Sequence, residues 1–555
     1  MKKLILPALA LLLASSTISG AMRSSKSDVT SNINIFSSII KELQANYVDS
    51  IDMNSIVETG ISAMLSRLDP YTEYFNVSEQ KEFRDRNAGE YAGIGSYIMQ
   101  RNGFVEISGP HEGSPAAAAG LRPGDRILAI DGEDMKGKTT EDVSGKLRGA
   151  IGSKTSVSVS RPWVTDSLLT VEVTREKIRI PAVTYYGVTD GNLGYIQLSQ
   201  YSEKSADEVK DALTDLMENS RIEGLILDLR GNGGGYLESA VKILGYFLPK
   251  GTEVLRTRGK GLRDEKIYRT SAKPIAPDLP LVVLTDGTTA SSSEITAGAL
   301  QDLDRAVILG MRTYGKGLVQ TTFGLPYDGM IKVTTAKYYI PSGRLIQSID
   351  YSERGTDGRP KQIADSLTRE FRTAGGRIVR DGGGITPDTL MEYPEVSRLL
   401  YNVVTDQWAY DFANKYRAEH PEAPSIDSIA ITDEIYGEFK NFIDPARFNY
   451  DKVCETAISD LRKLAKIEGY MSDEVDAQIT VLEGLMKHTL DKDLDTHRKA
   501  IAPYLEREIA SRYYYDRGET RSSLRHDDMF KAACSLLKDR NAYNSILNPA
   551  KAGKK

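Results

Sequence analysis

Short apolar runs of strand length alternate with amphipathic stretches of helical length between residues 178 and 392, and this alternation limits the fold more than any other feature of the chain. Strands are predicted at 193–198, 224–229, 281–284 and 306–309. Helices are predicted at 206–217, 237–248 and 293–300. Strands that alternate with helices are typical of a layered α/β domain, so we expect such a domain over residues 178–392.

Ser291 lies at the junction of a predicted buried strand and a predicted helix. A hydroxyl is a poor nucleophile unless a nearby base takes its proton. Histidine is the usual base, but none lies between His111 and His420. Lys316 follows Ser291 by 25 residues and is the remaining candidate, because serine–lysine pairs are a known variant of the serine-nucleophile arrangement. The pattern predicts a serine hydrolase with a lysine base.

A lysine can serve as a base only if its pKa falls well below the ordinary value of about 10.4. Burial disfavours the charged form, and the flanking Gly315 and Gly317 would let Lys316 pack closely against a core. Gln320, four residues further on, could orient the amine by a hydrogen bond. A Gly-Lys-Gly segment taken alone is more typical of a surface turn, so the assignment depends on Ser291.

The start of the helix after Ser291 should offer backbone N–H groups to a developing oxyanion. We expect the N–H of Ser292 to be one donor and the N–H of Gly234, in the glycine-rich segment 230–235, to be the other. Glu294 and Asp302 are interpreted as surface carboxylates without a catalytic role. No residue cluster has metal-ligand spacing, and the glycine-rich segment lacks the Gly-Lys-Ser/Thr of a phosphate loop.

Residues 89–177 have a different sequence pattern, which predicts short strands and contains many glycines. The informative segments are Gly93-Ile94-Gly95, Ser114-Pro115-Ala116, Gly120-Leu121, Gly124-Asp125 and Ile130-Asp131-Gly132. Together they resemble a PDZ domain. Such domains add a peptide as a strand to a sheet edge and hold its terminal carboxylate on backbone N–H groups, here those of Gly93, Ile94 and Gly95. The alternative is that these glycines only form turns.

The two ends of the chain are predicted to be different again. Residues 1–21 have the basic start, apolar run and small residues of a secretory signal peptide. Residues 22–88 look helical, as a packing or dimerising arm. Residues 393–555 look mostly helical and charged, either as a partner or dimer module or as a solvated cap.

Composition limits disulfides and partners. Two cysteines, Cys454 and Cys534, do not make a disulfide framework. The net charge of −6 argues against a nucleic-acid partner.

The assembled motifs resemble the C-terminal processing (tail-specific) protease family. They are Leu68-Asp69-Pro70-Tyr71-Thr72, Asp228-Leu229-Arg230-x-Asn232-x-Gly234-Gly235, Ala290-Ser291-x-Ser293-Glu294, Ala297 to Asp302, Thr313 to Gln320, Tyr338 to Arg344 and Gly383 to Asp388. The resemblance implies an α/β multidomain protein with a ClpP/crotonase-like core. It also implies Ser291 as nucleophile, Lys316 as base, Gln320 as the residue that orients it, and no metal or cofactor.

The function expected from the residues and the resemblance is an exported serine endopeptidase of the periplasm or cell envelope. It would cut proteins near free C-terminal tails that the PDZ domain captures, through an acyl-enzyme, and form a homodimer through its helical ends. One alternative is a non-catalytic PDZ scaffold, which would not need the serine–lysine pair. Another is an esterase or amidase, which would not need a tail-binding domain.

Overall fold

The computed structural model describes residues 28–164, 167–189, 191–261, 264–355, 358–448, 453–486 and 489–548. The predicted signal peptide lies outside the described residues. The chain forms two compact units, one of Met1–Val77 with Gln320–Thr334 and one of Ser78–Val319 with Thr335–Lys555.

The smaller unit contains most of residues 22–88, the N-terminal segment predicted to be helical. Residues 28–46 are helical, and α2 (Met53–Leu65) begins at Asp52, whose carboxylate accepts from the N–H groups of Asn54 and Ser55. The segment is not wholly helical, because β1 (Glu73–Phe75) pairs antiparallel with residues 330–332 of β18 (Met330–Tyr339).

The larger unit is built on a six-stranded sheet in the order β10-β11-β12-β15-β16-β23. Its strands are β10 (Val183–Thr189), β11 (Leu193–Leu198), β12 (Gly224–Asp228), β15 (Leu281–Thr285), β16 (Val307–Gly310) and β23 (Thr389–Leu390). All neighbours from β11 to β23 run parallel, and β10 is an antiparallel edge. The predicted α/β layers are confirmed, within one or two residues for the strands.

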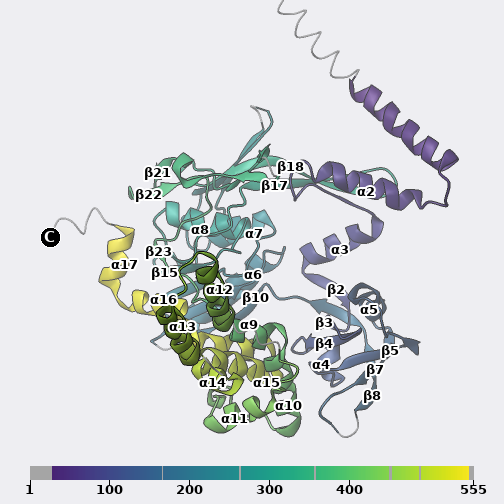
Figure 1. The fold of residues 1–555 in the computed structure, drawn as a ribbon. Coiled ribbons are helices and arrows are strands. Elements are labelled where there is room, and N and C mark those ends of the chain that lie inside the picture. Colours follow the sequence, from purple (N-terminus) through teal and green to yellow (C-terminus); the bar gives the residue numbers. More distant parts are fainter. Residues whose placement is uncertain are drawn as a thin grey trace, which may run out of the picture. The chain divides into compact units, whose positions relative to one another are not determined.

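Helices cover both faces of this sheet (Figure 1). On one face α6 (Ser205–Glu218), α7 (Leu237–Leu244) and α8 (Ser292–Asp302) bury apolar side chains against Leu225 and Leu227. On the other face α16 (Asp528–Lys538) and α17 (Arg540–Leu547) pack against side chains such as Ile226. Alternate residues of a strand point to opposite faces, so a strand covered on both is expected to be a continuous apolar run, as β12 and β15 are up to their last residues, Asp228 and Thr285.

A second sheet forms the β-rich region that precedes the core. Its main path is β3-β4-β5-β7-β8, formed by β3 (Ser96–Arg101), β4 (Phe104–Pro110), β5 (Arg126–Ile130), β7 (Lys154–Ser160) and β8 (Leu168–Thr174). The helices α4 (Pro115–Ala118) and α5 (Thr140–Leu147) accompany it. β3 is an edge strand of this sheet, which is where a PDZ domain adds a peptide.

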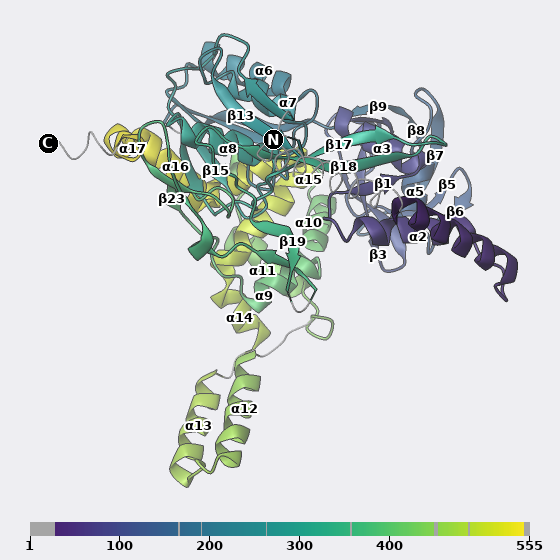
Figure 2. The same ribbon diagram turned by 90° about the horizontal axis from the view of Figure 1, so that it is seen from above.

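The last third of the chain is mostly helical, as expected. Besides α16 and α17, its helices are α9 (Arg398–Thr405), α10 (Trp408–Glu419), α11 (Asp433–Phe442), α12 (Val453–Ile467), α13 (Asp473–Met486), α14 (Leu490–Thr496) and α15 (Arg498–His526). α12 and α13 pair as a hairpin (Figure 2). Cys454 and Cys534 are not joined by a disulfide.

The predicted α/β domain also contains antiparallel strands that the sequence did not suggest. In the larger unit β13 (Glu253–Gly259) pairs with β14 (Glu265–Arg269) and with residues 336–339 of β18. Two smaller hairpins follow, β19 (Ile349–Arg354) with β20 (Pro360–Gln362) and β21 (Glu370–Arg372) with β22 (Ile378–Arg380). Within the described part of the chain, no helix is both long and apolar enough to cross a membrane.

Candidate active site

Ser291 stands at a strained turn between β15 and α8. Its backbone has φ 56° and ψ −116°, which is costly for a residue with a side chain. The turn is fixed by Asp286, whose Oδ1 accepts from the N–H groups of Thr288 and Thr289, both at 2.9 Å. A sharp strand-to-helix turn of this kind exposes a nucleophile above a sheet.

The structure distinguishes Ser291 from the two serines that follow it. The hydroxyl of Ser292 donates to the Gly235 carbonyl and that of Ser293 to the Asn232 carbonyl, each at 2.9 Å. Both of these side chains are buried, at 1% and 0% exposure, whereas Ser291 is half-buried. Ser291 is therefore the accessible hydroxyl of the three.

Glu294 connects the Ser291 turn to the Lys316 segment. Its Oε2 accepts from the backbone N–H groups of Ser291 at 2.9 Å and Lys316 at 2.8 Å. Its Oε1 accepts from the Thr313 hydroxyl at 2.5 Å and the Gly315 N–H at 2.7 Å. One carboxylate thus fixes the backbones of both predicted dyad members.

Glu294 is fully buried, so its interpretation as a surface carboxylate was wrong. Burial raises the pKa of Glu294 to about 7, although the hydrogen bonds from Thr313, Lys316, Ser291 and Gly315 act in the opposite direction. The sequence did contain a signal for this contact. Ser291-x-x-Glu294 fits the capping-box pattern, in which the acid of the first helical turn reaches back to the N-cap N–H.

Tyr338 is a second link between the same two segments. Its hydroxyl donates to the Lys316 carbonyl at 2.5 Å and lies 3.2 Å from the Ser291 carbonyl. The glycines beside Lys316 are needed for close packing. A Cβ on Gly315, whose φ is +87°, would lie 2.5 Å from the Ser348 side chain, and one on Gly317 would lie 2.9 Å from the Gln347 backbone nitrogen.

Gly234 lies directly against the Ser291 turn. A Cβ at this position would be 2.7 Å from the Ala290 carbonyl oxygen and 2.9 Å from the backbone nitrogen of Ser292. The two predicted oxyanion donors therefore come from adjacent backbone. The N–H of Gly234 donates to Asn232 Oδ1 at 2.9 Å, so it would have to exchange or share this partner to donate to an oxyanion.

The glycine-rich loop is tied to both sides of the site. The N–H of Gly231 donates to Asp286 Oδ2 at 3.0 Å, and the Asn232 side chain donates to the Leu198 carbonyl at 2.7 Å. Before the loop, Asp228 ends β12 and forms an ion pair with Arg230 at 2.6 Å. Arg230 also contacts Asp527 at the start of α16, so the C-terminal helices help to fix this loop.

Gln320, the predicted orienting residue, lies on β17 (Leu318–Gly324). Within its own unit its side-chain nitrogen donates to the Thr334 hydroxyl at 3.2 Å. Among the described residues no group of three or more His, Cys, Asp or Glu side chains is arranged to hold a metal ion.

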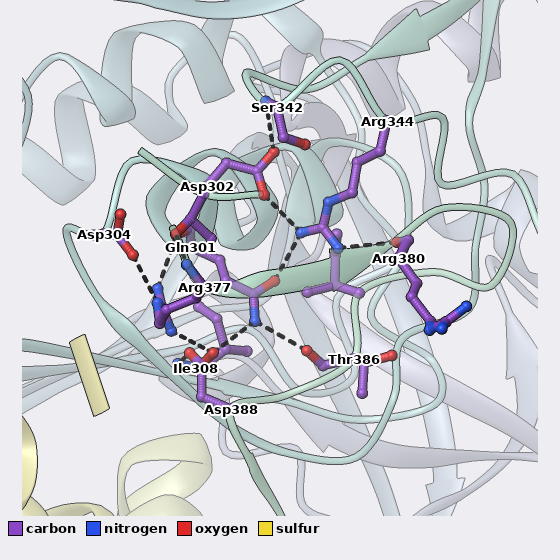
Figure 3. A network of polar contacts seen from close by, with 12 residues as sticks. Gln301, Asp302, Asp304, Ile308, Ser342, Arg344, Arg377, Arg380, Thr386 and Asp388 are labelled. Atoms are coloured by element: carbon purple, nitrogen blue, oxygen red, sulfur yellow. Dashed lines mark hydrogen bonds and ion pairs between the residues drawn. The ribbon is translucent and has the colours of Figure 1, made fainter. Parts of the chain in front are cut away.

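A buried polar network lies at the C-terminal end of α8 (Figure 3). It contains residues of three sequence motifs, Ala297 to Asp302, Tyr338 to Arg344 and Gly383 to Asp388. Arg344 donates to Asp302 at 2.8 Å and to Gln301 at 2.7 Å. Arg377 contacts Asp304 at 2.6 Å and Asp388 at 2.5 Å. Asp302 is 2% exposed, so its interpretation as a surface carboxylate was also wrong. The network holds the end of α8 and the segments after β18 and β22 together.

Residues 93–95, predicted to bind a tail, connect β2 (Glu90–Gly93) to β3, and the positive φ of Gly95 shapes this connection. Gly95 has φ +76°, and a Cβ there would lie 2.5 Å from the Ser114 side chain. Ile94 is buried in the core of this domain, while Gly93 ends β2 (Glu90–Gly93), which pairs with β9 (Glu176–Arg179). The loop leads directly into edge strand β3.

Comparison with known proteins agrees with this architecture. Peptidase family S41 matches residues 192–352, a PDZ domain matches residues 106–161, and a domain described as "Probable PDZ-protease, C-terminal helical domain" matches residues 399–537. The carboxy-terminal-processing protease of Bartonella bacilliformis is 36% identical over 317 residues, which are 57% of this chain and 72% of the relative. The chain belongs to the carboxy-terminal-processing protease family.

Another relative and a solved structure are also similar to this chain. A probable CtpA-like serine protease of Staphylococcus aureus is 32% identical over 334 residues, which are 60% of this chain and 66% of the relative. A solved photosystem II D1 C-terminal processing protease is 28% identical, covers 63% of this chain and 86% of its own, and has a TM-score of 0.35. The chain described here is thus a peptidase with a PDZ domain and a C-terminal helical domain.

Proposed function

We propose that the chain is an exported serine endopeptidase that cuts proteins near their C-terminal tails. Ser291 is the nucleophile and Lys316 the base that takes its proton. The observation that carries this proposal is the buried Glu294, whose two oxygens accept from the N–H groups of Ser291 and Lys316 and their neighbours. A structure that fixes these two segments together is suited to a dyad.

In this mechanism the Ser291 oxygen attacks the scissile carbonyl while Lys316 accepts the hydroxyl proton. The N–H groups of Ser292 and Gly234 stabilise the oxyanion, each contributing about 3–4 kcal/mol. Lys316 then gives its proton to the leaving amine, which completes the acyl-enzyme. Water, deprotonated by the same lysine, releases the product. Gln320 is proposed to orient the amine, as in the family motif that it matches.

The β-rich domain is proposed to capture the free tail before cleavage. The exposed edge of β3 supports this, since its unpaired backbone groups can accept an added strand. The Gly93–Gly95 loop at the start of β3 is proposed to hold the terminal carboxylate. Export is proposed from the signal sequence predicted at residues 1–21.

A homodimer through the helical ends is part of the same proposal. On helix 28–46 the apolar side chains of Ile35, Phe36 and Ile39 are each at least half exposed, which supports an intermolecular contact there. Native mass measurement tests it, and a clean monomer would contradict it. We infer too that the parallel sheet with its two helical layers follows the ClpP/crotonase arrangement.

The test of the activity is hydrolysis of an unstructured protein with a free C-terminal tail. Ser291→Ala and Lys316→Ala should each lower kcat by about 10⁴-fold or more. Ser293→Ala removes a hydroxyl from the same turn and should retain most activity. Cleavage by both dyad variants at the wild-type rate would refute the dyad. Tail binding without cleavage by the wild type would favour the scaffold alternative.

A further inference from the structure

A cavity of about 640 Å³ separates the β-rich domain from the C-terminal helices. One wall comes from β3, β4 and the turns at 117–123 and 161–162, and the other from α10 and α15 with Val404 and Gln407. This volume lies within the roughly 300–1,000 Å³ of small-ligand sites. Residues 93–95 do not line the cavity, so it is distinct from the proposed tail-binding loop.

One part of the lining carries an excess of positive charge. Arg122 and Arg161 come from the β-rich domain and Arg417 from α10. Asp125 is fully buried and engages Arg161 through two hydrogen bonds of 2.7 Å. In the described part of the chain neither Arg122 nor Arg417 forms an ion pair; the Arg417 guanidinium donates to the Pro421 carbonyl at 2.8 Å.

The proximity of these arginines shows in their electrostatics. Burial lowers the pKa of Arg122, and the charges of Arg161 and Arg417 lower it further. Of the three guanidinium groups only that of Arg161 is paired with Asp125, whose other contact is the backbone N–H of Arg122 at 2.8 Å. An anionic group entering the cavity would relieve this repulsion.

Another part of the lining holds acidic side chains, beside Arg512, which pairs with Glu508 at 3.1 Å, while Arg507 lies 3.7 Å from Glu519. Glu508, Asp516 and Glu519 lie on α15. Burial raises the pKa of Glu519, Arg507 opposes this rise, and the charges of Glu508 and Asp516 add to it. Asp516 is exposed and forms no ion pair within the described residues.

Polar and aromatic side chains complete the lining. Tyr97, Tyr410 and Tyr515 belong to it, and Tyr515 is the site of a kink in α15, with φ 53° and ψ −148°. Strained backbone of this kind is concentrated at ligand sites. Gln407 also lines the cavity, and across the described residues its buried Oε1 accepts no hydrogen bond, so it can accept one from a ligand N–H.

We propose that this cavity binds short peptides with two free termini. The peptide carboxylate would lie toward Arg122, Arg161 and Arg417, and its ammonium group toward Asp516 and Glu519. Arginine forks match carboxylates, and the separated charges of the lining match a zwitterion better than a simple anion. Since the two walls belong to different domains, a bound peptide would also hold the β-rich domain against the helices.

The experiment is calorimetric titration of tri-alanine into the full chain carrying Ser291→Ala, which prevents hydrolysis. Removing one charged contact by Arg122→Ala or Asp516→Asn should weaken binding by about tenfold, as expected for one charge-assisted hydrogen bond. N-acetyl and C-amide forms of the peptide should lose a similar factor. Thermal unfolding checks that each variant is folded.

Arg148→Ala is the matched control, because Arg148 lies beside Gly93 at the proposed tail-binding loop. It should leave tri-alanine binding unchanged. Weaker binding in Arg148→Ala with unchanged binding in Arg122→Ala would place the peptide on the β3 edge and overturn the proposal. Equal affinity for the blocked peptides, or no binding at millimolar concentration, would overturn it as well. Because only binding is measured, failure here leaves the proposed cleavage intact.

Discussion

At the scale of single residues, the site depends on one carboxylate, that of Glu294, which joins the Ser291 turn to the Lys316 segment. Glu294 alone accepts from four donors on two segments. An amide in its place must direct its NH₂ group at one pair of these donors. At least one buried N–H then loses its acceptor, at a cost of about 1–3 kcal/mol per group.

Glu294→Gln is therefore expected to displace the Ser291 and Lys316 segments and to change how the stability of the fold depends on pH. It should lower kcat by about 10–100-fold, because small displacements of reacting groups are costly. The pKa of Glu294 in the fold, about 7, exceeds its ordinary value of 4.5. The stability that its protonation adds is fully present below 4.5 and is lost as pH rises through 7.

The stability advantage of wild type over Glu294→Gln should consequently be larger at pH 5 than at pH 8. Urea unfolding at both pH values measures it. Glu203→Gln, at an exposed position, is the control and should show no such difference. An advantage that grows with pH would contradict the raised pKa.

Gly234→Ala tests the oxyanion loop at the same scale. The new Cβ would lie 2.7–2.9 Å from the Ala290 carbonyl, the Ser291 Cβ and the Ser292 nitrogen, so the turn must shift. We expect loss of kcat by about 10²-fold or more, the effect of losing an oxyanion donor. Gly231→Ala is the matched control, since it has a similar positive φ of +74° but nothing within 4 Å. Equal activity loss in both variants would show that backbone strain alone is responsible.

At the scale of elements, the prediction from sequence succeeded where periodicity was strong and failed where the partner was distant. β12 and β15 are continuous apolar runs up to their last residues, so their burial could be predicted. The second helical layer could not, because α16 and α17 follow β12 and β15 by more than 200 residues and pattern alone does not identify their partner. Asp302 was misinterpreted for a similar reason, since its partner Arg344 is far along the chain.

The covering role of α16 leads to a prediction for stability. Leu537 is 1% exposed and packs with Met529 and Phe530 against the sheet. Leu537→Ala should lower the free energy of unfolding by about 2–5 kcal/mol, through lost burial and a cavity. Lys531→Ala on the exposed side of the same helix should change it by less than about 0.5 kcal/mol. A small effect of Leu537→Ala in chemical denaturation would show that α16 is not part of the cooperative core.

At the scale of the larger unit, the β-rich domain is held by few polar contacts to the C-terminal helices. Arg101 on β3 makes a bidentate pair with Asp411 on α10, with both distances 2.6 Å. The Tyr410 hydroxyl donates to the Ile107 carbonyl at 3.2 Å. β3 therefore has two different sides, because one edge has no neighbouring strand in its sheet while the Arg101 side chain contacts Asp411 on α10.

This sharing predicts that Arg101→Ala loosens the contact without unfolding either domain. Both members of the pair are partly exposed, at 22% and 28%, so the pair contributes only about 1 kcal/mol or less. Hydrogen exchange of β3 and α10 should become faster together, while the melting temperature of the core stays unchanged. Lys154→Ala, which breaks a pair with Glu172 inside the β-rich domain, should not affect α10. If exchange in α10 is unaltered by Arg101→Ala, this pair does not couple β3 to the helices.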